Sequence, residues 1–379
     1  MNFSNVVGQQ AAKIGLLKMW KGNSMPHALL ITGAEGTGGL PLAIALAQYI
    51  FCENRTDIDS CGKCAGCSKV ARLEHADLHF SFPCISPKPN TKALSRIYMQ
   101  EFREFLKQTP YGTTFEWLQF INAENKQGNI PAEECREIIE KLYLKSYEGG
   151  KKIQIIWRPE YLGKEGNILL KLIEEPPQNT IMIFVAENRE DILATILSRT
   201  QEVKLAPIAA ADIAEALSTR SLADPRVASQ VAHLAMGSYT EALRLLQHAE
   251  NDLFPEVKQM FNVIFTRNGP GISAFIEQWS KAGREQQKNL LHYVIQLLEH
   301  ALKARYLPNA PLPLNDTEAE FARKFAAIDI PFESISKMID VLSDTIFYIE
   351  RNAHGKTQLH ALFIRLQYIR FGHELPAGT

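Results

Sequence analysis

A glycine-rich segment at residues 33–40 is the feature that most constrains this chain. It reads Gly-Ala-Glu-Gly-Thr-Gly-Gly-Leu and lies between an apolar strand, predicted over 28–32, and a predicted helix. This is the arrangement of a phosphate-binding loop, G-x-x-x-x-G-K-[ST], in which backbone amides hold phosphates, the Lys reaches the β- and γ-phosphates and the hydroxyl binds Mg²⁺. The candidate phosphate-binding glycines are Gly33, Gly36, Gly38 and Gly39.

The two side chains that act on phosphate and magnesium are missing from this loop. Gly39 stands at the lysine position and Leu40 at the Ser/Thr position. A second strand, predicted over 153–157, ends in Trp157 and Arg158, where ATPases of this topology have carboxylates that hold magnesium. Because both elements lack their working groups, we expect an ATPase-like fold without ATP hydrolysis. The loop amides alone still allow weak binding of a nucleotide or an anion.

Strands and helices alternate in the first half of the chain. Short apolar strands are predicted over 28–32, 153–157, 181–186 and 202–205. This alternation predicts an α/β fold with a mostly parallel sheet that is covered by helices on both faces. No convincing strand follows Pro207, and helical periodicity continues to the end. The predicted domains are an α/β domain at 1–206 with an insertion at about 83–128, a helical lid at 207–250 and a helical collar at 251–379.

Four of the six cysteines are close together in the sequence, with the spacing C-x8-C-x2-C-x2-C. They are Cys52, Cys61, Cys64 and Cys67. Each Cys-x2-Cys step lets two thiolates face one centre, and four thiolates fill the tetrahedral coordination of Zn²⁺, so the pattern predicts a structural zinc site in a knuckle at 52–67. The alternatives are reduced unpaired thiols, a redox pair of cysteines, and His75 in place of Cys52 as a ligand.

Charge and hydropathy argue against other classes of protein. The formal net charge is -1 over 379 residues, so no global positive field marks a free-standing nucleic-acid-binding protein. The sequence has no apolar run of about 18 residues, the length that spans a bilayer. Its N-terminus lacks a basic segment followed by an apolar one. We therefore expect a cytoplasmic protein without a membrane partner.

One arginine stands in a position that suggests catalysis in trans. Ser198-Arg199-Thr200 follows a short helix predicted over 192–197. An exposed Arg199 could reach an adjacent subunit and stabilise charge on the γ-phosphate of its ATP, an effect worth about 10³–10⁵ in rate. The alternative is an ordinary surface cation in a salt bridge.

Several strings of residues form a family pattern over most of residues 5–205. They are His-Ala-Leu-Leu at 27–30, the four-cysteine knuckle, His-Ala-Asp-Leu-His at 75–79, Asn-Ile-Leu-Leu-Lys-Leu-Ile-Glu-Glu-Pro-Pro at 167–177, and Thr-Ile-Leu-Ser-Arg-Thr at 195–200. In these strings the chain resembles the delta-prime subunits of bacterial DNA polymerase III clamp loaders, a family of AAA+ proteins. It departs from the family pattern at Thr200, which replaces the usual Cys, and in a longer insertion at 83–128.

The resemblance implies an AAA+ fold, made of an α/β domain and a small helical lid, followed by a collar that assembles a hetero-pentamer with gamma/tau and delta subunits. It implies that this complex opens a ring-shaped sliding clamp and places it on primed DNA. It also implies that Arg199 is an arginine finger for the ATP site of a neighbouring motor subunit. A loop without its Lys is similar to that of non-hydrolysing delta-prime members, so we expect the chain itself to lack ATPase and polymerase activity.

Two other functions stand beside this interpretation. A gamma/tau-like ATPase motor with an unusual loop is disfavoured by Gly39, Leu40 and Trp157. A zinc-knuckle nucleic-acid-binding protein on an inactive AAA+ fold is disfavoured by the charge of the knuckle, in which the only cations are Arg55 and Lys63.

Overall fold

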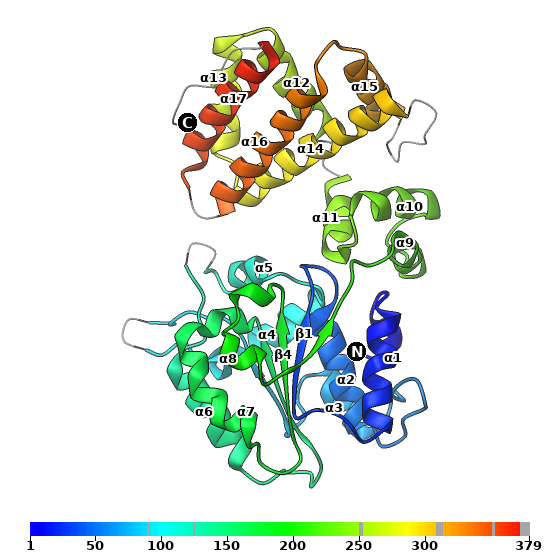
Figure 1. The fold of residues 1–379 in the computed structure, drawn as a ribbon, viewed down its shortest axis with the longest axis vertical. Coiled ribbons are helices and arrows are strands. Elements are labelled where there is room, and N and C mark those ends of the chain that lie inside the picture. Colours follow the sequence, from blue (N-terminus) through cyan, green and yellow to red (C-terminus); the bar gives the residue numbers. More distant parts are fainter. Residues whose placement is uncertain are drawn as a thin grey trace. The chain divides into compact units, whose positions relative to one another are not determined.

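The computed structural model describes residues 1–88, 91–123, 126–249, 253–307, 314, 316–350 and 353–371. The chain divides into two compact units, Met1–Leu245 and Leu246–Thr379 (Figure 1). The predicted boundary between lid and collar, at residues 250 and 251, lies outside the described residues. The three-part division of the chain therefore stays a prediction.

One parallel sheet of five strands organises the first unit. The strands are β1 (Ala28–Thr32), β2 (Leu78–Ser81), β3 (Lys152–Trp157), β4 (Thr180–Ala186) and β5 (Gln201–Lys204). Their order in the sheet is β2-β3-β4-β1-β5, and every pairing is parallel. The carboxyl ends of parallel strands meet at one edge of a sheet, so the segments that follow β1, β3 and β4 come together there. The predicted α/β fold is confirmed.

Helices cover both faces of this sheet (Figure 1). Leu29 and Ile31 of β1 belong to one core with α1 (Gln10–Lys21) and α2 (Gly39–Phe51). Ala28 and Leu30 belong to the opposite core, with α6 (Ala132–Tyr143), the 3-10 helix η3 (Pro159–Leu169), α7 (Leu170–Glu174) and α8 (Ala194–Leu197). Because both faces of β1 are buried, the strand reads as a continuous apolar run.

The insertion at 83–128 adds aromatic side chains to the core that contains α2. Its helices are η2 (Ser95–Tyr98), α4 (Met99–Gln108) and α5 (Thr114–Phe120). The ring of Phe102 stacks on Phe82 with centroids 3.9 Å apart, and Trp117 packs edge-on against both rings at 5.2 Å. Nε1 of Trp117 donates to the carbonyl of Pro83 at 2.7 Å. The insertion therefore adds a packed layer to the α/β domain.

Strand β2 is the element that the sequence analysis does not predict. Leu78 and Phe80 are buried in the core that contains α2, whereas His79 and Ser81 alternate with them and point to the other face. A strand this short, in which polar residues take every second place, lacks the apolar run of the other buried strands.

The part of the chain after β5 is helical in its described residues. A cluster of three helices comes first, α9 (Ala210–Thr219), α10 (Pro225–Leu234) and α11 (Tyr239–Ala249). The second unit contains α12 (Phe254–Phe265), α13 (Gly269–Ser280), α14 (Arg284–Tyr306), α15 (Asp316–Ala326), α16 (Phe332–Glu350) and α17 (Gly355–Phe371). An all-helical C-terminal region is thus confirmed. In the described parts of the chain, no helix has the length and apolar character that crossing a membrane requires.

A buried carboxylate, Asp77, fixes the loop between α6 and β3. Its oxygens accept hydrogen bonds from Oγ of Ser146 at 2.9 Å and from the backbone N–H groups of Tyr147 and Glu148 at 2.8 and 2.9 Å. Burial opposes ionisation of this carboxyl, but the three hydrogen bonds outweigh burial and hold the pKa of Asp77 below its usual range.

We expect Asp77→Asn to destabilise the chain by about 1.5–3 kcal/mol near neutral pH, because hydrogen bonds to a charged acceptor are lost. A carboxyl whose pKa is lower in the folded state contributes its stability above the unfolded pKa, about 4 for Asp, and loses it as pH falls through the folded value. Urea unfolding at neutral pH and at about pH 3 should therefore show a difference between wild type and variant that shrinks in acid. An equal difference at both pH values would contradict this account. Asp57→Asn is the control, because Asp57 is exposed and pairs with Lys21 at the surface. This variant should change stability little.

Candidate functional site

Four cysteine sulfurs converge between α2 and the short helix α3 (Ala65–Ala71). The Sγ atoms of Cys52, Cys61, Cys64 and Cys67 all lie within 4.8 Å of one another. The Cys61–Cys67 and Cys52–Cys64 sulfur pairs are each 3.9 Å apart. A tetrahedral zinc site with Zn–S bonds of about 2.3 Å has sulfur–sulfur edges of about 3.8 Å. The cluster could therefore bind a zinc ion.

The local backbone explains why these sulfurs meet. Cys64 is the N-cap of α3, and its sulfur accepts a hydrogen bond from the N–H of Cys67 at 3.4 Å. Gly66 lies against the end of α2, where an added Cβ would be 2.2 Å from the carbonyl oxygen of Phe51. A glycine is needed for this close approach, which brings Cys64 and Cys67 near Cys52, the residue that follows α2.

The alternative ligand His75 does not join the cluster. Its ring stacks on Phe51 with centroids 3.8 Å apart. Its Nδ1 accepts from the N–H of Asp77 at 3.2 Å, and its Nε2 lies 3.6 Å from Glu148. Hydrogen bonds from the backbone of Lys63 and Cys64 lower the pKa of the Cys61 thiol to about 6, which favours the thiolate that binds metal. Burial raises the pKa values of Cys52 and Cys67, so the four thiols do not all favour the thiolate.

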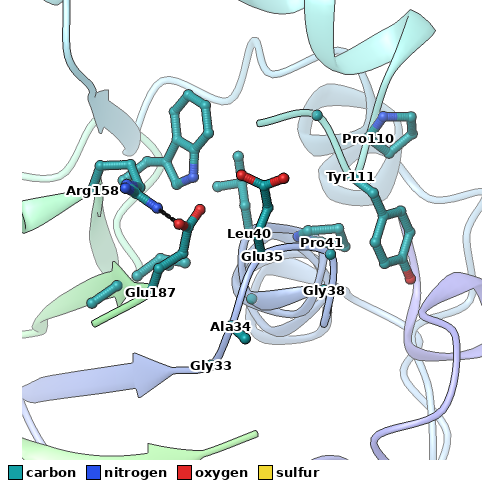
Figure 2. Close-up of a pocket in the computed structure, with 16 residues that line it drawn as sticks. Gly33, Ala34, Glu35, Gly38, Leu40, Pro41, Pro110, Tyr111, Arg158 and Glu187 are labelled. Carbon is teal, nitrogen blue, oxygen red and sulfur yellow. Dashed lines mark ion pairs between the residues drawn. The ribbon is translucent and has the colours of Figure 1, made fainter. Parts of the chain in front are cut away.

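The glycine-rich segment joins β1 to α2 and lines a small cavity (Figure 2). The other walls come from Pro110 and Tyr111 of the insertion and from the ends of β3 and β4, at Arg158 and Glu187. The cavity volume is about 40 Å³, whereas ligand pockets measure roughly 300–1,000 Å³. The four glycines that the sequence analysis singled out, Gly33, Gly36, Gly38 and Gly39, all line this cavity. Their role in binding phosphate stays a prediction.

Packing against the loop accounts for the small volume. A Cβ on Gly39, at the lysine position, would lie 2.9 Å from Cγ1 of Val185 on β4. A Cβ on Gly38, whose φ is +92°, would lie 2.9 Å from Cε1 of Tyr111. The side chain of Leu40 is buried. A side chain at position 39 would therefore require the side chain of Val185 to shift.

The start of α11 also closes on the loop. The N–H of Tyr239 donates to the carbonyl of Gly36 at 3.0 Å. A Cβ on Gly36 would lie 2.0 Å from Oγ of Ser238. Oγ1 of Thr240 donates to the carbonyl of Tyr111 at 2.6 Å. Protein groups thus contact the loop where a working phosphate-binding loop meets its nucleotide.

Two loop residues that the sequence analysis did not single out oppose phosphate binding. Pro41 is the third residue of α2 and has no N–H, so the helix start offers one amide fewer to an anion. The carboxylate of Glu35 projects over the loop (Figure 2) and lies 3.5 Å from Arg244 of α11. An incoming phosphate would meet this negative charge. The signal for Pro41 was present in the sequence, because a proline amide cannot donate.

The end of β3 carries an arginine-centred network. Arg158 forms ion pairs with Glu187, marked by the dashed line in Figure 2, and with Glu160. Oε1 of Glu160 accepts from the N–H groups of Glu187 and Asn188 at 2.7 and 3.2 Å. Burial raises the pKa of Glu160, and the nearby Arg158 only partly offsets this. Trp157 is buried against the aromatic side chains of the insertion.

Arg199 lies at the end of α8 and is not among the residues that line the cavity. Its side chain is 36% exposed, and Nε donates to Oε1 of Glu174 at 2.5 Å. A second donor of the guanidinium reaches the carbonyl of Thr195 at 3.0 Å, and Oγ1 of Thr195 bonds to Oδ1 of Asn167 at 3.2 Å. The strings at 167–177 and 195–200, which are distant in sequence, therefore meet around an exposed guanidinium.

Parts of this chain are similar to known proteins. A family model described as DNA polymerase III, delta subunit, matches residues 8–209. The DNA polymerase III subunit delta' of Bacillus subtilis (strain 168) is 24% identical over 267 residues, which are 69% of this chain and 67% of that protein. Subunit delta' of Escherichia coli (strain K12) is 27% identical over 182 residues, 48% of this chain and 42% of that protein.

A gamma subunit is also similar. The DNA polymerase III subunit gamma of Buchnera aphidicola subsp. Baizongia pistaciae (strain Bp) is 28% identical over 207 residues, 54% of this chain and 44% of that protein. The similar regions thus span less than half of the Escherichia and Buchnera proteins. Since the family model matches more than half of the chain, the chain belongs to the DNA polymerase III delta-prime subunit family of clamp-loader AAA+ proteins.

Proposed function

We propose that this chain is a non-hydrolysing, cytoplasmic clamp-loader subunit. In this proposal it assembles with gamma/tau and delta subunits into a hetero-pentamer that loads a sliding clamp on primed DNA. We assign residues 207–250 to the lid and 251–379 to the collar of that assembly. The observation that carries the proposal is the closed phosphate-binding loop, whose cavity of about 40 Å³ is bounded by the chain's own groups.

Three independent features support the absence of hydrolysis. The loop has Gly39 and Leu40 where a cation and a magnesium ligand are needed. The N–H of Tyr239 is bonded to the loop at Gly36. At the end of β3, Arg158 binds the nearby carboxylates. A mutation that altered one of these three features would leave the other two to oppose ATP hydrolysis.

We expect the purified full-length chain to release no phosphate from ATP above the buffer blank, because neither a cation nor a magnesium ion is positioned on the γ-phosphate. The measurement is a phosphate-release assay with Mg²⁺, and an authentic gamma-type subunit is the positive control. Turnover that follows the chain through successive purification steps would contradict the proposal. That result would favour the gamma/tau-like motor.

Arg199 is proposed as the arginine finger that completes a neighbour's ATP site. The guanidinium of Arg199 is bonded to Glu174, which fixes its orientation, and it is exposed, so another subunit can reach it. An arginine placed on a γ-phosphate in trans stabilises the charge of the transition state.

We expect Arg199→Ala to slow hydrolysis by about 10³–10⁵ at the single ATP site that it completes. Single-turnover hydrolysis by the reconstituted complex is the measurement, and size-exclusion chromatography checks assembly. The matched control is Arg189→Ala, because Arg189 is also an exposed arginine in an ion pair, with Glu202. Equal hydrolysis by the two variant complexes would show that the finger assignment is wrong.

We also propose that the four-cysteine cluster holds one structural zinc ion. The sulfurs are close enough for one tetrahedral ion, and four thiolates leave no open position for water. In isolated zinc fingers such an ion contributes on the order of 10–16 kcal/mol. Here it would join the end of α2 to α3.

Elemental analysis should find about one zinc per chain, and Cys64→Ser should lose the ion and melt at a lower temperature because one thiolate is removed. Cys135→Ala is the matched control, since Cys135 is a buried cysteine outside the cluster, and it should keep the zinc. A folded chain that melts at the same temperature after complete removal of metal would contradict a structural role.

A further inference from the structure

A groove beside β2 takes no part in the proposed function. It is lined by the segment from Leu73 to Phe80 and by residues of η2, α4 and α6. Its volume is about 340 Å³, which falls within the roughly 300–1,000 Å³ of ligand pockets. β2 is an end strand of the sheet, so a ligand can reach the groove without opening the sheet.

Three cations from three elements line this groove: Arg96 of η2, Arg103 of α4 and Lys141 of α6. Glu137 serves two of them, at 3.0 Å from Nε of Arg96 and 3.4 Å from Nζ of Lys141. Nε of Arg103 donates to the backbone carbonyl of Leu73 at 3.1 Å, which is a neutral partner. The carboxylates therefore do not balance the cations.

The charge around the groove can be counted from its ion pairs. The cations are Arg72, Arg96, Arg103 and Lys141, and the carboxylates are Glu74, Asp77 and Glu137. One positive charge is thus in excess. An anion that enters the groove gains from this excess and from the guanidinium groups, whose planar donors match phosphate oxygens in pairs.

Another part of the lining is apolar. Leu78 and Phe80 are buried, and Met99 lies beside them in the lining. His79 is neutral near physiological pH, because burial and then the charge of Lys141 lower its pKa to about 4. The ring of His79 lies on the other face of β2 and is an uncharged part of the lining.

We propose that this groove binds a small phosphate ester with a flat apolar body, a ligand of the nucleoside phosphate class. The phosphate lies between Arg103 and Lys141, and the body lies against Met99 and Phe80. Neither the cations alone nor the apolar wall alone accounts for the lining, whereas an ester of this kind uses both. The site is separate from the phosphate-binding loop, whose lining shares no residue with it.

Calorimetric titration of the full-length chain with ADP tests this proposal, together with NMR of methionine methyl groups labelled with ¹³C. We expect ADP to bind and to shift the Met99 methyl signal, assigned with Met99→Leu. The double variant Arg103→Gln/Lys141→Gln should weaken binding by about tenfold or more, because charge-assisted hydrogen bonds are lost. Arg136→Gln removes a charge from the same helix at a position paired with Glu133 outside the groove, and it should keep the wild-type affinity.

Two further arms make the result decisive. Arg103→Lys keeps the charge and loses only the planar fork of donors, so it should weaken ADP binding even where the double variant fails to fold. Sodium pyrophosphate, which lacks a body, should bind more weakly than ADP. The proposal is overturned by the absence of ADP binding, by undiminished binding in Arg103→Lys and the double variant, by an unshifted Met99 signal, or by pyrophosphate that binds as tightly as ADP.

Discussion

The close approach of protein groups to the glycine-rich loop determines what this α/β domain can do. A glycine in a phosphate-binding loop normally lets a phosphate reach the backbone, because no Cβ stands in the way. Here the missing Cβ atoms let protein atoms reach the loop backbone. Cγ1 of Val185 lies 2.9 Å from the position that a Cβ of Gly39 would take, and Cε1 of Tyr111 lies 2.9 Å from that of Gly38. Contacts within the chain thus surround the backbone of the loop.

These contacts couple three parts of the first unit that are far apart in sequence. The N–H of Tyr239 joins the helical cluster to the loop, and Oγ1 of Thr240 joins it to the insertion at Tyr111. The guanidinium of Arg244 lies 3.3 Å from Glu116 of α5. A nucleotide that opened the loop would have to break these bonds, each with a net value of about 1 kcal/mol, and expose the packed side chains. The arrangement therefore favours one closed conformation over a cycle of opening and closing.

The sequence was sufficient for features that depend on residues close to one another along the chain. The alternation of strands and helices, the missing lysine at Gly39 and the cysteine spacing are all local patterns, and the structure contains the sheet, the loop and the sulfur cluster that they predict. The closure of the loop could not be predicted from the sequence, because Gly36 and Ser238 are brought together only by the fold. Strand β2 was missed for a different reason, since His79 breaks an already short apolar run. The role of the insertion required knowledge of its aromatic packing.

The position of the candidate finger follows from the same rigid framework. Helix α2 is buried along nearly its whole length, with the closed loop at its start and the four-cysteine knuckle at its end. The loop continues from β1, and β1 pairs with β5 in a register that places Leu29 opposite Gln201. Arg199 precedes that paired residue by two positions, so its backbone is tied to β1 and through β1 to the loop. An arginine that acts on a ligand of another subunit must be held in place by its own domain, because it has no bound nucleotide to organise it. The contacts that close the loop belong to the same packed domain, so the proposed loss of a nucleotide site and the proposed role of Arg199 are both consistent with one packing arrangement.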